Sequence, residues 1–401
     1  MDMDHLHSET IGIIGGYDQK AGARYKSFTP PLCQTVTFPL ESAETARRIY
    51  DHRDPYHDYV YTRRNNPTND IFEQRMAAME GGEAALATSS GMAAVFSIAG
   101  YLLEAGAECV VSNRTYAKTF EVFNRTFTKF GVRVRMVNDP TNHDDWAARV
   151  NKNTRFMFVE TPSNPGLVIS DISKLAKIGD AHGVPLIVDN TLASPIATKP
   201  LELGAAVVIE SVSKYISGNG STLGGILVTK KDWIDEIRRT IYVQCGMTSA
   251  PFNSWLGMLG LETLGPRIKQ HTENAMQVAR YLQDHPKVAT VNYPGLEAHP
   301  QHDLARKQMS GLYGGLLSFV LKQDKREAVY KFIDSLRVVT HAIHLSATRS
   351  IISNPPSTNY AELTEAELAA ANIPMGLIRF SVGIEHIEDL LKDLDQALDR
   401  I

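Results

Sequence analysis

Polar side chains that could take part in catalysis or ligand binding follow three apolar segments of the sequence, each at the point where a strand is expected to end. Ligands of open α/β sheets bind beyond the carboxyl ends of the strands, so these side chains are predicted to share one edge of a sheet. The segments are 155–161, 186–188 and 206–209, and the polar residues that follow them are Asn164, Asp189, Ser211, Ser213 and Lys214.

A second feature is the turn Ser89-Ser90-Gly91-Met92, which precedes a helical pattern and offers free backbone amides to an anion. Each feature alone has an ordinary explanation, such as a helix cap or a solvated lysine. Together they fit one ligand, a phosphorylated aromatic cation that forms an imine, which is pyridoxal 5′-phosphate (PLP). The lysine would form the imine, the aspartate would keep the pyridine nitrogen protonated, and hydroxyls and amides would hold the phosphate.

The elements that must position these residues alternate between short apolar segments and helical patterns. Strands are predicted at 85–88, 108–112, 132–138, 155–161, 186–189, 206–209 and 225–229, and helices at 66–80, 90–100, 118–130, 171–181 and 251–264. Continuous apolar strands between helices favour an α/β fold whose sheet is mainly parallel and covered on both faces. The segments 316–321 and 377–382 are predicted strands of a smaller C-terminal α+β domain.

The length of 401 residues favours more than one domain. We predict an N-terminal arm over 1–62, which contributes to a neighbouring subunit, a large PLP-binding domain over 63–262, and a C-terminal domain over 263–401. Lys plus Arg number 41 and Asp plus Glu 45, a net charge of 41 − 45 = −4, so there is no basic excess that would favour nucleic acid as a partner. We expect no membrane association and no bound metal, and Cys33, Cys109 and Cys245 form no CxxC pair, which suits a cytoplasmic protein.

The sequence resembles the PLP-dependent enzymes of cysteine and methionine metabolism, the cystathionine γ-synthase-like family, and among them especially the O-acylhomoserine sulfhydrylases. The resemblance covers nearly the whole chain and implies fold type I of the PLP-dependent transferases. The matching segments are Tyr61-Thr62-Arg63 with Asn66-Pro67-Thr68, Ser90-Gly91-Met92, Glu160-Thr161-Pro162-Ser163-Asn164-Pro165, Val188-Asp189-Asn190-Thr191, Ser211-Val212-Ser213-Lys214-Tyr215, Gly260-Leu261-Glu262-Thr263-Leu264 and Ile378-Arg379-Phe380-Ser381-Val382-Gly383.

The resemblance implies a role for each matching residue. Lys214 is the expected Schiff-base lysine and proton carrier, and Tyr116 the tyrosine that stacks on the ring and takes part in proton transfer. Asp189 is expected at the pyridine nitrogen and Arg379 at the substrate carboxylate. The remaining expected cofactor contacts are Asn164 at the ring oxygen, and Ser90, Gly91, Met92, Ser211 and Ser213 at the phosphate.

Tyr61 and Arg63 match residues that reach the phosphate of a neighbouring subunit, and Tyr61 is also expected near the substrate. The resemblance therefore implies a homo-oligomer with active sites built by dimers, usually assembled as a tetramer. The implied reaction acts on a small amino acid. It either replaces a leaving group at Cγ by a thiol or eliminates that group to give a 2-oxo acid and ammonia.

Several pocket positions depart from the family pattern. Lys118 stands where methionine γ-lyases have cysteine, Glu210 where relatives have histidine, and His344 where they have the serine of Ser-Leu-Gly. His344 is therefore a candidate substrate contact, and Asn359-Tyr360 replaces a common Thr-His. We expect γ-replacement or γ-elimination on an activated homoserine, with a dedicated γ-lyase as the alternative, acting on a canavanine-type, cystathionine or methionine-like substrate.

Three other motifs in the sequence point to different functions, but each is incomplete. Ser211-x-x-Lys214 matches part of the penicillin-binding acyl-enzyme motif, but no Lys-Thr-Gly follows it. His299-x-x-His302 lacks a third metal ligand, and Gly218-x-Gly220 misses the dinucleotide fingerprint. A non-catalytic binding protein with a PLP fold stays open, and a Lys214→Ala variant that kept the biological effect would support it.

Overall fold

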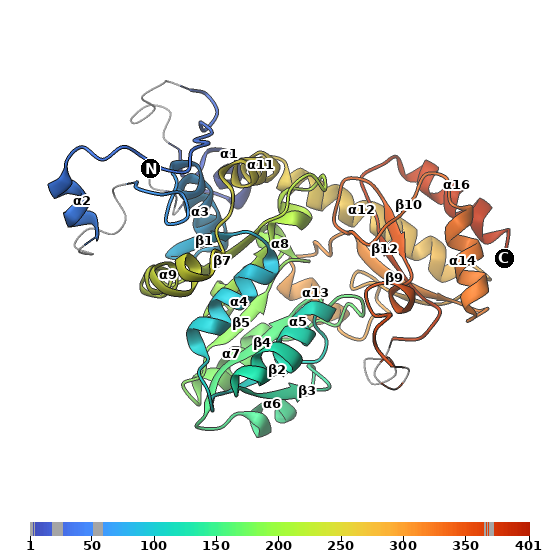
Figure 1. The fold of residues 1–401 in the computed structure, drawn as a ribbon. Coiled ribbons are helices and arrows are strands. Elements are labelled where there is room, and N and C mark those ends of the chain that lie inside the picture. Colours follow the sequence, from blue (N-terminus) through green and yellow to red (C-terminus); the bar gives the residue numbers. More distant parts are fainter. Residues whose placement is uncertain are drawn as a thin grey trace.

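The structure is a computed structural model that describes residues 3, 5–17, 27–50, 59–364, 366, 368 and 373–401. A long helix, α12 (Leu264–Asp284), runs from a large part of the molecule into a smaller C-terminal part (Figure 1). The predicted fold class, α/β with a mainly parallel central sheet and a smaller sheet in a second region, is confirmed. The exact domain limits at 62 and 262 stay a prediction, and part of the predicted arm (1, 2, 4, 18–26 and 51–58) lies outside the described residues.

The large sheet has the strand order β1-β7-β6-β5-β4-β2-β3. All neighbouring pairs are parallel except those that β7 makes with β1 and β6. The strands are β1 (Ala84–Thr88), β2 (Glu108–Ser112), β3 (Arg133–Val137), β4 (Thr154–Glu160), β5 (Leu186–Asp189), β6 (Val207–Ser211) and β7 (Gly225–Thr229).

Apolar side chains on both faces of this sheet explain its uninterrupted hydrophobic strands. In β4, Phe156 and Phe158 pack on one face with α4 (Gly91–Leu102), while Met157 and Val159 pack on the other with α7 (Ile172–Asp180). The other helices of this part are α1 (Ser8–Ile14), α2 (Ala43–Tyr50), α3 (Pro67–Glu80), α5 (Ala117–Glu121), α6 (His143–Arg149), α8 (Ser194–Ala197), α9 (Lys231–Ile237), α10 (Val243–Cys245) and α11 (Pro251–Leu261).

The smaller sheet has the order β10-β11-β12-β9-β8 and is antiparallel except for the β10–β11 pair. One face packs on α12, α14 and α16 through a single apolar cluster. The elements are β8 (Val288–Asn292), α13 (His302–Gln308), β9 (Leu316–Leu321), α14 (Arg326–Ser335), β10 (Thr340–His341), β11 (Ile351–Ser353), β12 (Leu377–Ser381) and α16 (Ile387–Leu398). None of the described helices is long and apolar enough to cross a membrane.

The predicted helix over 118–130 is interrupted. After α5 the chain forms a π-helical turn, η1 (Val122–Thr126), and then a 3₁₀ turn, η2 (Phe127–Phe130). Side chains bond to the backbone here: Asn124 donates to the Phe120 carbonyl (3.2 Å) and Thr128 to the Asn124 carbonyl (2.9 Å). Such side-chain bonds compete with the regular i to i−4 hydrogen bonds of an α-helix. The apolar periodicity of the sequence does not reveal this competition.

Candidate active site

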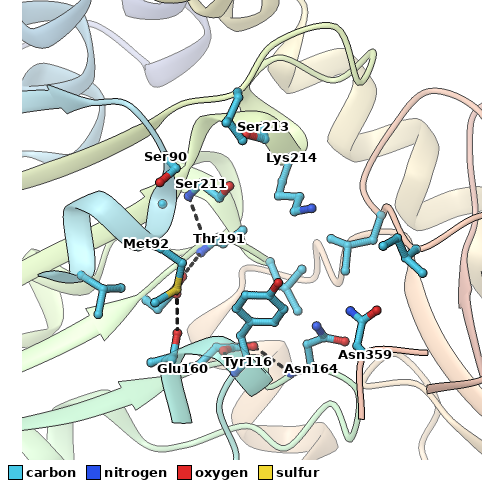
Figure 2. A pocket seen from close by; sticks show the side chains of 18 of the residues that line it. Ser90, Met92, Tyr116, Glu160, Asn164, Thr191, Ser211, Ser213, Lys214 and Asn359 are labelled. Carbon is cyan, nitrogen blue, oxygen red and sulfur yellow. Dashed lines mark hydrogen bonds between the residues drawn. The ribbon is translucent and has the colours of Figure 1, made fainter. Parts of the chain in front are cut away.

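The carboxyl ends of β4, β5 and β6 meet beside the start of α4 and enclose a cavity of about 200 Å³ (Figure 2). Residues predicted from separate strand ends therefore lie together. Of the predicted site residues, those lining the cavity are Ser90, Gly91, Met92, Tyr116, Asn164, Asp189, Ser211, Ser213, Lys214 and Arg379. His344 lines an adjoining cavity, which also contacts Tyr116 and Lys214.

Lys214 lies in η4 (Val212–Ile216), a π-helical turn directly after β6. Its backbone departs from helical geometry (φ −102°, ψ −126°), and its half-buried side chain extends into the cavity (Figure 2). Nζ lies 3.2 Å from Nδ1 of His344. Burial and, to a smaller extent, the positive charge of Arg379 lower the pKa of Lys214 to about 8, so a neutral, nucleophilic amine is accessible near neutral pH.

Asp189 ends β5 and accepts a hydrogen bond at Oδ1 from the backbone N–H of Thr191 (3.1 Å). Burial raises the pKa of this carboxyl. Among the described residues, no cation forms an ion pair with Asp189. A carboxyl in this setting lacks a positive partner, and a protonated ring nitrogen would supply one.

Glu160 is a site residue whose role the sequence did not predict, although it begins a matching segment. It pairs in register with Asp189 across β4 and β5, and its carboxyl accepts the backbone N–H groups of Tyr116 and Asn164 (2.8 Å for Asn164). Burial and the neighbouring Asp189 raise its pKa well above the ordinary value. Glu160 thus holds in place two of the residues expected to contact the ring.

The first turn of α4 faces β6 across a narrow gap. A Cβ on Gly91 would lie 3.0 Å from Cβ of Ser211, so only glycine fits without a shift. Ser90 caps the helix by accepting from the N–H of Ala93, and Ser213 Oγ accepts from the N–H of Gly224 (3.1 Å). A helix N-terminus and small hydroxyl side chains on one rim make a cradle suited to a phosphate.

Arg379 of β12 is 2% exposed and brings the smaller sheet to the cavity. Its guanidinium donates to Oδ1 of Asn164 (3.2 Å) and to the carbonyl of Ile343 (3.2 Å). Burial lowers its pKa to about 10, and no carboxylate among the described residues pairs with it. A buried guanidinium with spare donors is suited to an anionic ligand group.

The residues that depart from the family pattern lie in different places. Burial and the charges of Lys214 and Arg379 lower the pKa of His344 to about 4, so its ring is neutral at physiological pH. Lys118 is half-exposed at the adjoining cavity, and Tyr360 donates to the carbonyl of Asn164 (3.0 Å). Glu210 does not line the cavity; it is buried near Glu80 of α3.

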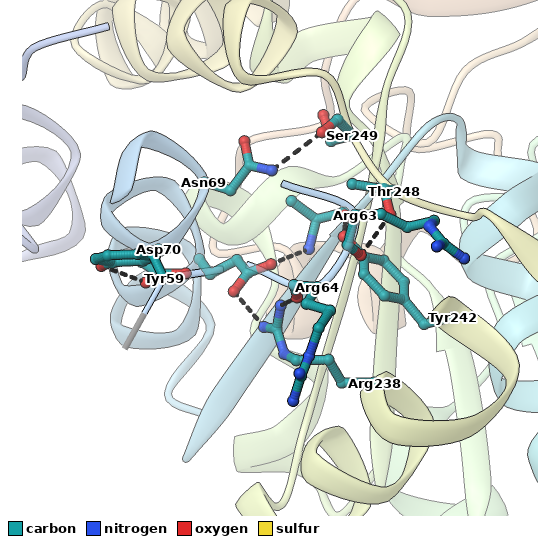
Figure 3. Close-up of polar contacts among 11 residues, drawn as sticks. Tyr59, Arg63, Arg64, Asn69, Asp70, Arg238, Tyr242, Thr248 and Ser249 are labelled. Atoms are coloured by element: carbon teal, nitrogen blue, oxygen red, sulfur yellow. Dashed lines mark hydrogen bonds and ion pairs between the residues drawn. The ribbon is translucent and has the colours of Figure 1, made fainter. Parts of the chain in front are cut away.

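Tyr61 and Arg63 lie apart from the cavity that contains Lys214. They line a separate hollow, where the Arg63 guanidinium is 5.5 Å from the ring centre of Tyr61. Polar contacts fix this segment to the large domain (Figure 3): Thr248 donates to the carbonyl of Arg63 (2.9 Å), and Arg238, which pairs with Glu73, donates to the carbonyl of Arg64 (3.1 Å). Within one chain, these two residues do not reach the cavity.

A family model described as "Cys/Met metabolism PLP-dependent enzyme" matches residues 9–399. The chain belongs to this family. An L-methionine γ-lyase of Fusobacterium nucleatum is 40% identical over 94% of this chain and 95% of its own, and an O-succinylhomoserine sulfhydrylase of Pseudomonas aeruginosa is 40% identical over 84% and 83%. A putative O-acetylhomoserine (thiol)-lyase of Campylobacter jejuni, solved with a pyridoxyl-lysine phosphate, superposes with a TM-score of 0.93 at 32% identity, covering 98% of this chain and 100% of its own.

PLP is therefore the cofactor of this enzyme, and the predicted family and cofactor are confirmed. The cavity fits the group on its own geometry. It holds an amine of lowered pKa and a helix start crowded against Ser211, together with a carboxyl and a buried guanidinium that form no ion pair with any residue the structure describes. Both predicted reaction types, replacement and lyase, occur among the relatives.

The lowered pKa of Lys214 predicts how the apoenzyme captures PLP. Only the neutral amine attacks an aldehyde, so the capture rate should rise with pH and level off above the Lys214 pKa of about 8. An ordinary exposed lysine would level off only near 10. Stopped-flow absorbance of apoenzyme mixed with PLP measures the midpoint, and a midpoint near 10 would contradict the lowered pKa.

Proposed function

We propose that the enzyme catalyses γ-replacement or γ-elimination on an activated L-homoserine-type amino acid, as an O-acylhomoserine sulfhydrylase does. The observation that supports this most directly is the placement of Lys214, Asp189 and Arg379 around one cavity. That arrangement provides a base, a partner for the ring nitrogen and a carboxylate clamp. The relatives named for sulfhydrylase and γ-lyase reactions support the same class of substrate.

Each residue then has a task on the substrate. Arg379 binds the α-carboxylate and orients the Cα–H bond, while the Lys214 amine removes the Cα proton, gives it up to the bound cofactor and, neutral again, removes a proton from Cβ. PLP, when bound, supplies an electron sink for the carbon atoms that lose those protons. Asp189 holds a proton on the ring nitrogen, and the Tyr116 hydroxyl protonates the group that leaves Cγ.

Arg379→Leu is expected to raise KM for the amino acid by about 100-fold, because a buried bidentate contact to the carboxylate is lost. Arg379→Lys keeps the charge but not the planar fork and should raise KM about 10-fold. Initial rates over a range of substrate concentrations separate KM from kcat. An unchanged KM in both variants would remove Arg379 from the substrate site.

The second candidate is a dedicated γ-lyase for a substrate with a cationic leaving group, such as an oxyguanidine of the canavanine type. Two acids favour it. Lys118 Nζ lies 2.8 Å from Glu121 and 3.8 Å from Glu362, so two carboxylates face one ammonium beside the adjoining cavity. Of these carboxylates, Glu362 lines the adjoining cavity, and a carboxylate there is suited to pair with a guanidinium. Cystathionine and methionine-like substrates belong to the same lyase alternative.

A substrate panel separates the two. O-acetylhomoserine, O-succinylhomoserine, methionine, cystathionine and canavanine are each incubated with and without sulfide, and the products are identified by mass spectrometry. Homocysteine formed only with sulfide supports replacement, and 2-oxobutanoate with ammonia supports elimination. Homoserine is measured too, because water can act as the replacing nucleophile. No turnover of any of these compounds would contradict both functions.

We also propose that the active site is shared between subunits of a homo-oligomer. The segment around α2 projects from the body (Figure 1), and Phe28 and Val36 of the same region are 86% and 62% exposed, which is unusual for large apolar side chains. Arg63 would then reach the phosphate in a partner subunit.

The three cysteines are unpaired, which supports a cytoplasmic location that cell fractionation would test.

Mixing two inactive variants tests the shared site. Lys214→Ala and Arg63→Ala are each expected to be inactive, but a mixed dimer contains one site with both residues intact. Activity should therefore recover to about a quarter of wild type after the variants are unfolded and refolded together, by random pairing. No recovery, with light scattering showing a monomer, would contradict the proposal.

A further inference from the structure

A cluster of buried acids lies behind the end of β5. Asn190, the residue after Asp189, places Nδ2 3.1 Å from Oε1 of Glu80, 3.1 Å from Oε1 of Glu210 and 2.9 Å from the carbonyl of Thr198. The two carboxyls therefore accept from the same amide nitrogen and lie side by side. Glu80 and Asn190 are 0% exposed and Glu210 is 1% exposed. None of the three belongs to the catalytic steps above.

Within the described chain, no cation forms an ion pair with either glutamate. The nearest charged groups on the neighbouring segment are Lys199 and Glu202, and these pair with each other (3.5 Å). Two ionised carboxylates side by side in the protein interior would be strongly unfavourable. A proton on one carboxyl would let it donate to the other, and Glu80 Oε2 has no other hydrogen-bond partner among the described residues.

We propose that Glu80 and Glu210 share one proton and, through Asn190, act as positioning residues that fix Asp189 against the cofactor. This inference rests on the proposed PLP site. It assigns a task to Glu210, which stands where relatives have histidine.

The connection from the acids to the site is short. Asn190 is held on its side chain by both acids and on its backbone by the carbonyl of Ile209 (2.8 Å). The next residue, Thr191, donates its N–H to Asp189 and accepts at Oγ1 from the N–H of Ser211 (2.9 Å). The segment 189–191 therefore connects the acid pair to both the ring-nitrogen partner and the phosphate cradle.

The protonation states follow from the surroundings. Burial raises the pKa of Glu80 and raises that of Glu210 well above its ordinary value; the charges of Glu80 and Asp189 add to the rise for Glu210. The charged groups that face the pair are Asp189 from β5 and Lys199 and Glu202 from the segment that follows α8. Among these charged groups only Lys199 opposes the rise, for Glu80, and it is engaged with Glu202, while hydrogen bonds from Asn190 act against the rise in both acids.

The first test compares an isosteric with an apolar replacement. Glu210→Gln keeps the shape and the hydrogen bonding and should keep PLP affinity within about 2-fold, whereas Glu210→Leu leaves Asn190 without one acceptor and should weaken PLP binding about 10-fold. The visible circular dichroism of bound PLP should change in Glu210→Leu as well. Glu108→Leu is the matched control: Glu108 is 1% exposed but lies at the opposite end of β2 and pairs with Arg135, so its loss should lower thermal stability and leave the PLP signal unchanged.

The second test counts the shared proton. In the native state the pair holds one proton, whereas above about pH 5 both acids are ionised in the unfolded chain. The native state therefore binds one more proton than the unfolded state, so stability falls as pH rises. The unfolding constant should increase roughly tenfold per pH unit. Glu210→Gln removes this proton and should flatten the decline in unfolding temperature between about pH 6 and about pH 9. The carboxylic-acid C=O stretch of the pair should disappear from the infrared spectrum of Glu210→Gln.

The outcomes are distinct. Parallel pH profiles for wild type and Glu210→Gln would overturn the shared proton, even if Glu210→Leu fails to fold. Equal PLP affinity and circular dichroism in wild type and Glu210→Leu would overturn the positioning role. A wild-type protein that binds no PLP would instead contradict the proposed function itself.

Discussion

Lys214→Ala is expected to lower kcat on the order of 10⁴-fold and to abolish covalent attachment of PLP, because one amine serves both as attachment point and as base. Nζ is the amine that the structure directs into the cavity, with His344 at 3.2 Å and a pKa lowered to about 8. Treatment with borohydride followed by mass spectrometry should show a gain of the pyridoxyl phosphate mass in wild type and none in the variant.

Folding is not expected to suffer in this variant, since burying an ammonium near Arg379 is unfavourable and alanine removes that cost. Lys174→Ala is the control: its ammonium is exposed on α7 and 3.5 Å from Asp171, so activity and PLP attachment should stay unchanged. A Lys214→Ala protein that still retained PLP mass after reduction would place the attachment on another lysine.

The large sheet and the residues at its strand ends were predictable because both depend on short stretches of sequence. A parallel strand such as 186–189 is apolar up to its last residue, and the residue where the apolar run stops lies at the edge where ligands bind. Asp189, Asn164 and Lys214 each come within a few residues of such a point, so their meeting in one cavity follows from the sheet order.

Contacts between distant segments were not predictable in the same way. His344 reaches Lys214 from 130 positions away, and Tyr360 reaches Asn164 from the loop that precedes β12. Those contacts depend on how the smaller sheet packs against the large one, which no local pattern specifies. The task of Glu160 was missed for a related reason: its partners are backbone amides of Tyr116 and Asn164, and backbone groups leave no signature in the choice of residue.

The acid pair shows a different limit. The sequence revealed that Glu210 departs from the family pattern, and its position next to Ser211 suggested a place near the pocket. Because side chains alternate along a strand, Glu210 points to the face opposite Ser211 and meets Glu80 instead. An unusual residue in a catalytic motif can therefore act from behind the site.

Asp189→Asn is the second substitution with a large expected effect, a loss in kcat of about 10²–10³-fold with PLP still attached. Asparagine has the size of aspartate and can still accept the N–H of Thr191 at Oδ1, so the geometry at the end of β5 should persist. It carries no charge, however, and a neutral amide does not hold a proton on the ring nitrogen it faces. KM should change little, because Arg379 binds the substrate carboxylate independently.

The pH dependence strengthens this test. Burial raises the pKa of Asp189, and a protonated ring nitrogen beside it opposes that rise, so the bound cofactor should favour the carboxylate form. In wild type, activity should fall as the pH decreases through the pKa of Asp189, while in Asp189→Asn this acidic limb should be absent. Asp171→Asn is the matched control: Asp171 caps α7 through the N–H of Lys174 (3.0 Å), and asparagine caps helices equally well, so both rate and pH profile should be retained. An Asp189→Asn enzyme with wild-type kcat would show that the ring nitrogen needs no charged partner in this protein.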